Sequence, residues 1–142
     1  MKVLSLLQPW ASLVIMQQKE YECRSWTTRY RGPLLIHASS KKPSRREKQF
    51  FEQAAYFRNY IHDMEELPYG CLIGKVVLQE IYTTSYLLHF MDGRPHHKWQ
   101  QELAFDDYSP DRFAWHLTDA TSLEHFIPVK GTLGLWSYEG RL

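Results

Sequence analysis

A long extended segment, Cys71–Thr83, occupies the middle of the chain. It is the longest strand candidate and is rich in β-branched side chains, which fit the pleated surface of a sheet. A second segment, Leu34–Ala38, is apolar on both faces, so we expect it to be a central strand. Strands of such mixed length favour a small, largely antiparallel β-barrel. Further strands are expected at 2–7, 21–26 and 113–117, with extended regions at 122–126 and 133–138.

Helical patterns interrupt the strands in two main places. Apolar residues recur at helical spacing over 9–18, which predicts an amphipathic helix. Ser44 and Glu47 form a capping-box pattern, which predicts a second helix over roughly 44–62. Helices beside a β-barrel place the chain in the α+β class, and 142 residues are the size of a single domain, 1–142. A short helix is expected over 85–91, whereas 98–112 shows no regular pattern.

The composition is that of a folded protein, with 44% hydrophobic and 15% aromatic residues. No apolar run approaches the ~20 residues that cross a bilayer, so we expect a cytoplasmic protein without membrane contact. Cys23 and Cys71 lack the spacing of metal ligands, and we expect reduced thiols. His96 and His97 are adjacent on a predicted loop, where their side chains diverge, and no cysteine or carboxylate pair completes a zinc pattern. We therefore expect neither a metal nor another cofactor.

The net charge is only +1, but it is unevenly spread along the chain. Residues 19–48 hold nine Lys or Arg and three Glu, a balance of +6, and the remainder has a balance of −5. Such asymmetry can mark a surface for an anionic partner. The same charges can also serve only to keep the protein soluble, and charge alone favours neither interpretation.

Three charged residues, Lys19, Glu22 and Arg24, lie within six positions of one another. On a strand the side chains alternate between faces, so Glu22 and Arg24 should point the same way, with Lys19 near the turn that precedes them. A cation, an anion and a second cation can therefore line one edge of a groove. The alternative is a surface ion-pair cluster, which is common and contributes little.

Ordered sequence blocks run through nearly the whole chain. The first, Leu4–Ala11, contains Gln-Pro-Trp, and the second is the spaced set Lys19, Glu22 and Arg24. Others are Arg31–Ala38, Gly70–Gly74, Phe113–Trp115 and Pro128–Trp136. In these blocks the chain resembles the ASCH (activating signal cointegrator homology) domain family of the PUA-like superfamily. The family signature has a glycine where this chain has Gln17, and a side chain there resists a left-handed turn.

The resemblance implies a PUA-like barrel with a cleft between the barrel and the helices, suited to RNA, single-stranded nucleic acid, or a nucleotide or nucleoside. Some branches of the family are thought to bind RNA or DNA, one hydrolyses an N4-acylated cytidine, and nuclease activity is known in another. The hydrolase branch has a threonine nucleophile where this chain has Glu22, and a carboxylate has no hydroxyl proton for a base to remove. Resemblance to the family alone therefore does not choose a reaction.

The charged residues suggest distinct roles at such a cleft. Lys19 and Arg24 are expected to contact phosphate or ribose, and Glu22 to accept from an exocyclic amine of a base. Lys41 and Lys42 lie at a strand end before a predicted helix N-terminus, which favours an anion. The predicted ligand-binding residues are Lys19, Glu22, Arg24, Trp26, Arg29, Tyr30, Ser39, Lys41 and Lys42, with Trp10 as a further stacking candidate.

Three functions are left open by the sequence. The first is an RNA- or nucleotide-binding domain that uses a basic cleft around Lys19, Glu22 and Arg24. The second is an enzyme in the same cleft, either an amidohydrolase on an N4-acylated cytidine or a metal-independent ribonuclease, in which Lys19 and Glu22 would be catalytic. The third is a protein-interaction module that uses exposed aromatic residues.

Overall fold

The computed structural model describes residues 1–96 and 98–142. In these residues six strands form one sheet, in the order β2-β5-β4-β3-β1-β6. Every predicted strand is present, β4 has the predicted bounds, and β5 joins two of the predicted segments into one long strand. The strands are β1 (Lys2–Leu6), β2 (Tyr21–Arg24), β3 (Gly32–Ala38), β4 (Cys71–Thr83), β5 (Phe113–Pro128) and β6 (Leu135–Ser137).

The sheet is largely antiparallel, but it is open. β1 pairs with β3 in parallel, and the other neighbouring strands pair antiparallel. No pairing in residues 1–96 or 98–142 joins the edge strands β2 and β6, so the predicted closure into a barrel is not found. The physical reason lies at β2, because helix α4 (Trp99–Phe105) and Asp106 cover its outer edge in place of a further strand. The coarser prediction, a mixed α+β domain with flanking helices, is confirmed.

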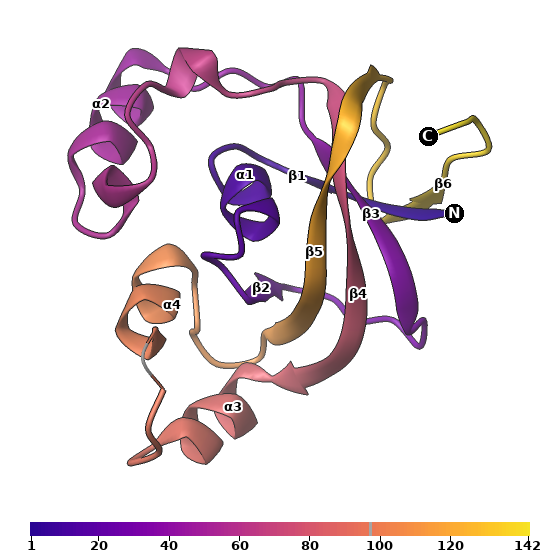
Figure 1. The fold of residues 1–142 in the computed structure, drawn as a ribbon. Helices are drawn as coiled ribbons and strands as arrows, with labels where there is room; N and C mark the ends of the chain where they lie inside the picture. Colours follow the sequence, from indigo (N-terminus) through magenta and orange to yellow (C-terminus); the bar gives the residue numbers. More distant parts are fainter. Residues whose placement is uncertain (97) are drawn as a thin grey trace.

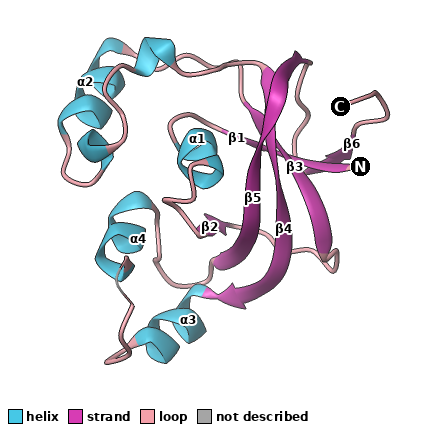
Figure 2. Ribbon diagram, in the orientation of Figure 1, coloured by secondary structure: helices cyan, strands magenta, loops and turns pink. Residues whose placement is uncertain are grey.

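The helices lie to one side of the sheet in Figure 2. In Figure 1 helix α1 lies between the sheet and the outer helices α2 and α4. The remaining bounds are α1 (Trp10–Ile15), α2 (Arg45–Gln53) and α3 (Thr84–Met91), with the 3₁₀ turns η1 (Phe57–Asn59) and η2 (Met64–Glu66). No helix in the described parts of the chain has both the length and the hydropathy of a bilayer-spanning segment.

Two helix predictions need correction. The capping box of Ser44 and Glu47 is present at the start of α2, as predicted. However, α2 ends at Gln53 and not near residue 62, because Ala54 is extended with a ψ of 143°. The region 98–112, which has no regular sequence pattern, contains α4. Its buried residues include Gln101 and Glu102, so the buried face does not show up as an apolar stripe.

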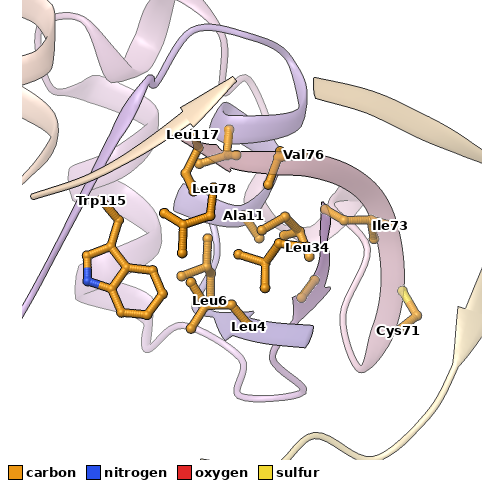
Figure 3. Close-up of a cluster of buried hydrophobic side chains, with 13 residues drawn as sticks. Leu4, Leu6, Ala11, Leu34, Cys71, Ile73, Val76, Leu78, Trp115 and Leu117 are labelled. Carbon is orange, nitrogen blue, oxygen red and sulfur yellow. The ribbon is translucent and has the colours of Figure 1, made fainter. Parts of the chain in front are cut away.

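Helix α1 is packed on two sides, and this fixes the elements around the candidate site. One side contributes Ala11 and Val14 to a core with strand residues that include Leu4, Leu34 and Trp115 (Figure 3). The other side contributes Leu13 to a second cluster, which joins α1 to α2, the 3₁₀ turns and α4. That second cluster consists of Leu13, Phe51, Phe57, Ile61, Met64 and Phe105.

Candidate functional site

A tight turn after α1 brings Lys19 into the interior. Gln17 has a φ of 62°, so the left-handed turn is kept although glycine is absent. The backbone amides of Gln18 and Lys19 both donate to the carbonyl oxygen of Leu13, at 3.0 and 3.1 Å. The chain therefore reverses direction between α1 and β2, and Lys19 is only 2% exposed.

Lys19 is the centre of a buried ion-pair network. Its Nζ donates to the carbonyl oxygen of Tyr21, to Glu22 Oε1 at 3.0 Å and to Asp106 Oδ2 at 2.6 Å. An ammonium group has three donors, so all of them are used. Burial alone would lower the pKa of Lys19, but the carboxylates of Glu22, Asp106 and Glu102 outweigh burial and hold that pKa above its ordinary value.

Two carboxylates of the α4 segment bind the outer edge of β2. Glu102 accepts from the backbone amides of Glu20 and Tyr21, the latter at 3.2 Å, and Asp106 Oδ2 accepts from the amide of Cys23 at 2.9 Å. Glu102 lies within α4, and Asp106 directly follows the helix with an extended backbone. These bonds take the place of a neighbouring strand, which is why the sheet ends at β2.

A pocket of about 180 Å³ lies beside this network and is lined by Leu7, Trp10, Glu22, Arg24 and Asp106. Arg24 Nη1 donates to Glu22 Oε2 at 3.3 Å, which agrees with the prediction that these two side chains share one face of the strand. Lys19 does not line this pocket, because it lies behind the two carboxylates. The pocket therefore presents one cation, two carboxylates and one indole ring.

Two lysines lie at a neighbouring hollow that shares Trp10 with the pocket. A small hollow of about 20 Å³ shares Leu7 and Trp10 with the pocket and is also lined by Lys41 and Lys42. A third concavity, of about 680 Å³, shares Lys42 with that hollow. Its lining residues are Lys42, Pro43, Ser44, Arg45, Lys48, Glu65 and Tyr69, with Lys42 Nζ 4.0 Å from the centre of the Tyr69 ring.

The remaining predicted residues lie outside these concavities. Trp26 packs edge-on against Trp115, with a centroid distance of 4.8 Å, and the Arg24 guanidinium lies over its ring. Tyr30 donates its hydroxyl to the Pro33 carbonyl oxygen, which fixes the turn before β3. Arg29 is exposed, and Ser39 Oγ accepts from the Lys41 amide at 3.2 Å. None of these four residues is part of the lining of the pocket or of the hollow, and Trp26 contacts the pocket residue Arg24.

Sequence reasoning missed Glu102 and Asp106. Both lie in the segment without a regular sequence pattern, and the signal that could have found them is their spacing of four positions. Asp106 changes the electrostatics, because Lys19 and Arg24 are balanced by Glu22 and Asp106. The pocket itself is therefore not basic, and the excess of positive charge lies toward α2.

The histidine pair singled out in the sequence lies only partly within the described residues, because His97 falls outside them. Glu20 Oε2 lies 3.7 Å from His96 Nε2 and 3.5 Å from His116 Nε2. A hydrogen bond to His116 lowers the pKa of Glu20, against the opposing effect of burial. Within residues 1–96 and 98–142, no three His, Cys, Asp or Glu side chains are arranged to hold a metal ion.

Comparison with known proteins identifies the fold and the family. The chain is 32% identical to human activating signal cointegrator 1 and 31% identical to the mouse protein, over 98% of its own length but only 22% of theirs. The crystal structure of an ASCH protein from Zymomonas mobilis superposes with a TM-score of 0.56 at 15% identity, over 97% of this chain and 87% of that one. The ASCH domain model matches residues 4–126. The chain therefore belongs to the ASCH domain family.

Proposed function

We propose that this ASCH domain binds RNA by taking one unpaired nucleotide into the pocket between Trp10, Glu22, Arg24 and Asp106. The observation that carries the proposal is the convergence of an indole ring, a guanidinium and two carboxylates on one concavity of about 180 Å³. Proteins bind unpaired bases by stacking them on aromatic rings and by hydrogen bonds to the base edges. This pocket offers both kinds of contact.

Trp10 supports the proposal because its ring is held in place before any ligand arrives. Its indole N–H donates to the carbonyl oxygen of Phe105. Its ring also meets Phe51 edge-on, with a centroid distance of 5.2 Å and an interplanar angle of 84°. A fixed ring loses little conformational freedom when a base stacks on it, so more of the stacking energy contributes to binding.

Arg24, Lys41 and Lys42 are the residues that we assign to phosphate. Arg24 lines the pocket, and the two lysines line the hollow that shares Trp10 with it. Lys41 and Lys42 are exposed. Lys19 has a different role in this proposal: its ammonium is enclosed and fully hydrogen-bonded, so it positions Glu22 and Asp106 and does not touch the ligand.

The enzyme alternatives receive less support from the same pocket. The described residues that line it offer carboxylates, a guanidinium, an indole and a leucine, but no hydroxyl or thiol nucleophile. Both carboxylates already accept hydrogen bonds from Lys19. Carboxylates that already accept such hydrogen bonds are better suited to binding a ligand than to attacking it as nucleophiles.

Binding of a fluorescently labelled single-stranded RNA tests the proposal. Trp10→Leu removes the stacking surface, and we expect the Kd to rise about 10-fold or more, because base–aromatic stacking contributes ~1–3 kcal/mol. The double variant Lys41→Gln/Lys42→Gln should weaken binding and make it less salt-dependent. Its logarithmic salt slope should fall by about 0.7 for each phosphate that a lysine no longer neutralises.

Lys75→Gln is the matched control, because Lys75 is an exposed cation on β4 that lines none of these concavities. It should bind RNA like the original protein, and circular dichroism should show that every variant is folded. A Kd that is insensitive to salt and unchanged by Trp10→Leu would rule the proposal out.

A further inference from the structure

We infer that the pocket selects a base with an exocyclic amine, which means cytosine, adenine or guanine, and rejects uracil. The inference rests on the function proposed above and specifies its ligand. The carrying observation is that two carboxylates of the lining keep free acceptor sites, whereas the free donors of the described lining all belong to one side chain, Arg24.

The free acceptors are the two carboxylates. A carboxylate offers about four acceptor sites. Glu22 accepts from Lys19 and Arg24, which leaves about two sites. Asp106 accepts from Lys19, from the Cys23 amide and, at 2.7 Å, from the amide of Asp107, which leaves about one. Glu22 is 7% exposed, so a ligand reaches its free sites from the pocket that it lines.

Apart from those of Arg24, the side-chain donors nearby are bound within the protein. All three donors of Lys19 are used, and the indole N–H of Trp10 goes to the Phe105 carbonyl oxygen. Leu7 has no polar side-chain atom. Arg24 is therefore the one side chain in the described lining with donors left for a ligand.

Both carboxylates bind the same ammonium, with Nζ–O distances of 3.0 and 2.6 Å, so their oxygens lie close to one another. An exocyclic amine carries two N–H donors and can bond to such a pair of acceptors. Uracil presents a carbonyl oxygen at the position where cytosine has its amine. That oxygen would face Glu22 and Asp106 without a hydrogen between them, which is unfavourable when the group is desolvated.

Short homopolymers of cytidine, adenosine and uridine, equal in length and carrying the same label, provide the test. We expect the uridine strand to bind about 10-fold more weakly or worse, since a good base-edge contact discriminates by about that factor or more. A cytidine strand whose amine is replaced by dimethylamine should bind as weakly as the uridine strand, because it has no N–H donor at that position. This comparison needs no change to the protein.

Glu22→Gln tests the same point from the protein side. The amide presents an N–H₂ group that can bond to the carbonyl oxygen of uracil, so the preference against uridine should shrink. Asp106→Asn is the second variant, should Glu22→Gln fold poorly, and Lys75→Gln should keep the original preference. Thermal melts establish that each variant is folded.

The possible results separate this inference from the function on which it rests. Tight, salt-dependent binding of all three strands with equal affinity overturns the base selection and leaves RNA binding intact. Undiminished binding of the dimethylated strand also overturns it. Failure of all three strands to bind overturns RNA binding itself, and the inference with it.

Discussion

Glu102 is a carboxylic acid whose surroundings disfavour its charge. It is 1% exposed, and burial raises its pKa to about 7, although Lys19 and the backbone amides of Glu20 and Tyr21 act in the opposite direction. The protonated form is therefore well populated near neutral pH. This residue makes the stability of the domain depend on pH in a way that exposed carboxylates do not.

Replacing Glu102 by Gln should remove that dependence. The carboxyl group binds its proton more tightly in the folded chain than in the unfolded chain, where its pKa is near 4.5. Its stabilising contribution is therefore complete below pH 4.5 and is lost as the pH rises toward 7. Between pH 4.5 and 7, urea unfolding should show that the original protein loses on the order of 3 kcal/mol of unfolding free energy relative to Glu102→Gln. Glu66→Gln, at an exposed position, is the control, and a difference that stays constant with pH would contradict the prediction.

At the scale of elements, one buried cation reinforces the contact between β2 and the α4 segment. Lys19 joins Glu22 of β2 to Asp106 at the end of α4. Lys19→Met would leave both carboxylates without their partner in a buried setting, and we expect it to cost about 3–5 kcal/mol of unfolding free energy. Arg24→Met removes a more exposed cation and should cost about 1 kcal/mol or less.

Urea unfolding measures the two costs, and hydrogen exchange at the amide of Cys23 reports whether α4 still covers the strand. That amide donates to Asp106, so its protection should fall in Lys19→Met. If Lys19→Met were as stable as the original protein yet unable to bind RNA, Lys19 would be a ligand contact and not a positioning residue.

Most elements were predictable from sequence, because their pattern is carried by apolar residues. The strand Cys71–Thr83 and the alternation that pairs Glu22 with Arg24 both follow from local periodicity. Helix α4 was not predictable in this way, because part of its buried face is polar. Because α4 was not predicted, Asp106 was not recognised as part of the pocket, and the pocket was predicted to be basic. The left-handed turn at Gln17 could not be predicted from the local sequence either. It is held by hydrogen bonds from the backbone amides of Gln18 and Lys19 to the carbonyl oxygen of Leu13.

At the scale of the whole molecule, the proposed function places base contacts and phosphate contacts on separate surfaces. Within residues 19–48, the cations Lys19 and Arg24 are paired with the carboxylates of Glu22 and Asp106. A group of exposed cations, Lys41, Lys42, Arg45 and Arg46, lies before and at the start of α2. Charge asymmetry read from the sequence therefore located the basic surface only coarsely.

Because the three concavities share lining residues, we predict that the Kd for RNA depends on the length of the strand. The pocket shares Trp10 with the hollow at Lys41 and Lys42, and that hollow shares Lys42 with the larger concavity, which Arg45 also lines. A strand that fills the pocket can thus extend its phosphates toward α2, so the Kd should fall as a single nucleotide is lengthened to several. Arg45→Gln should weaken binding of the longer RNA, lower its salt slope by about 0.7 and leave the mononucleotide unaffected. Equal losses for both lengths would place Arg45 at the pocket itself, and no loss for either would mean that the strand leaves the pocket in another direction.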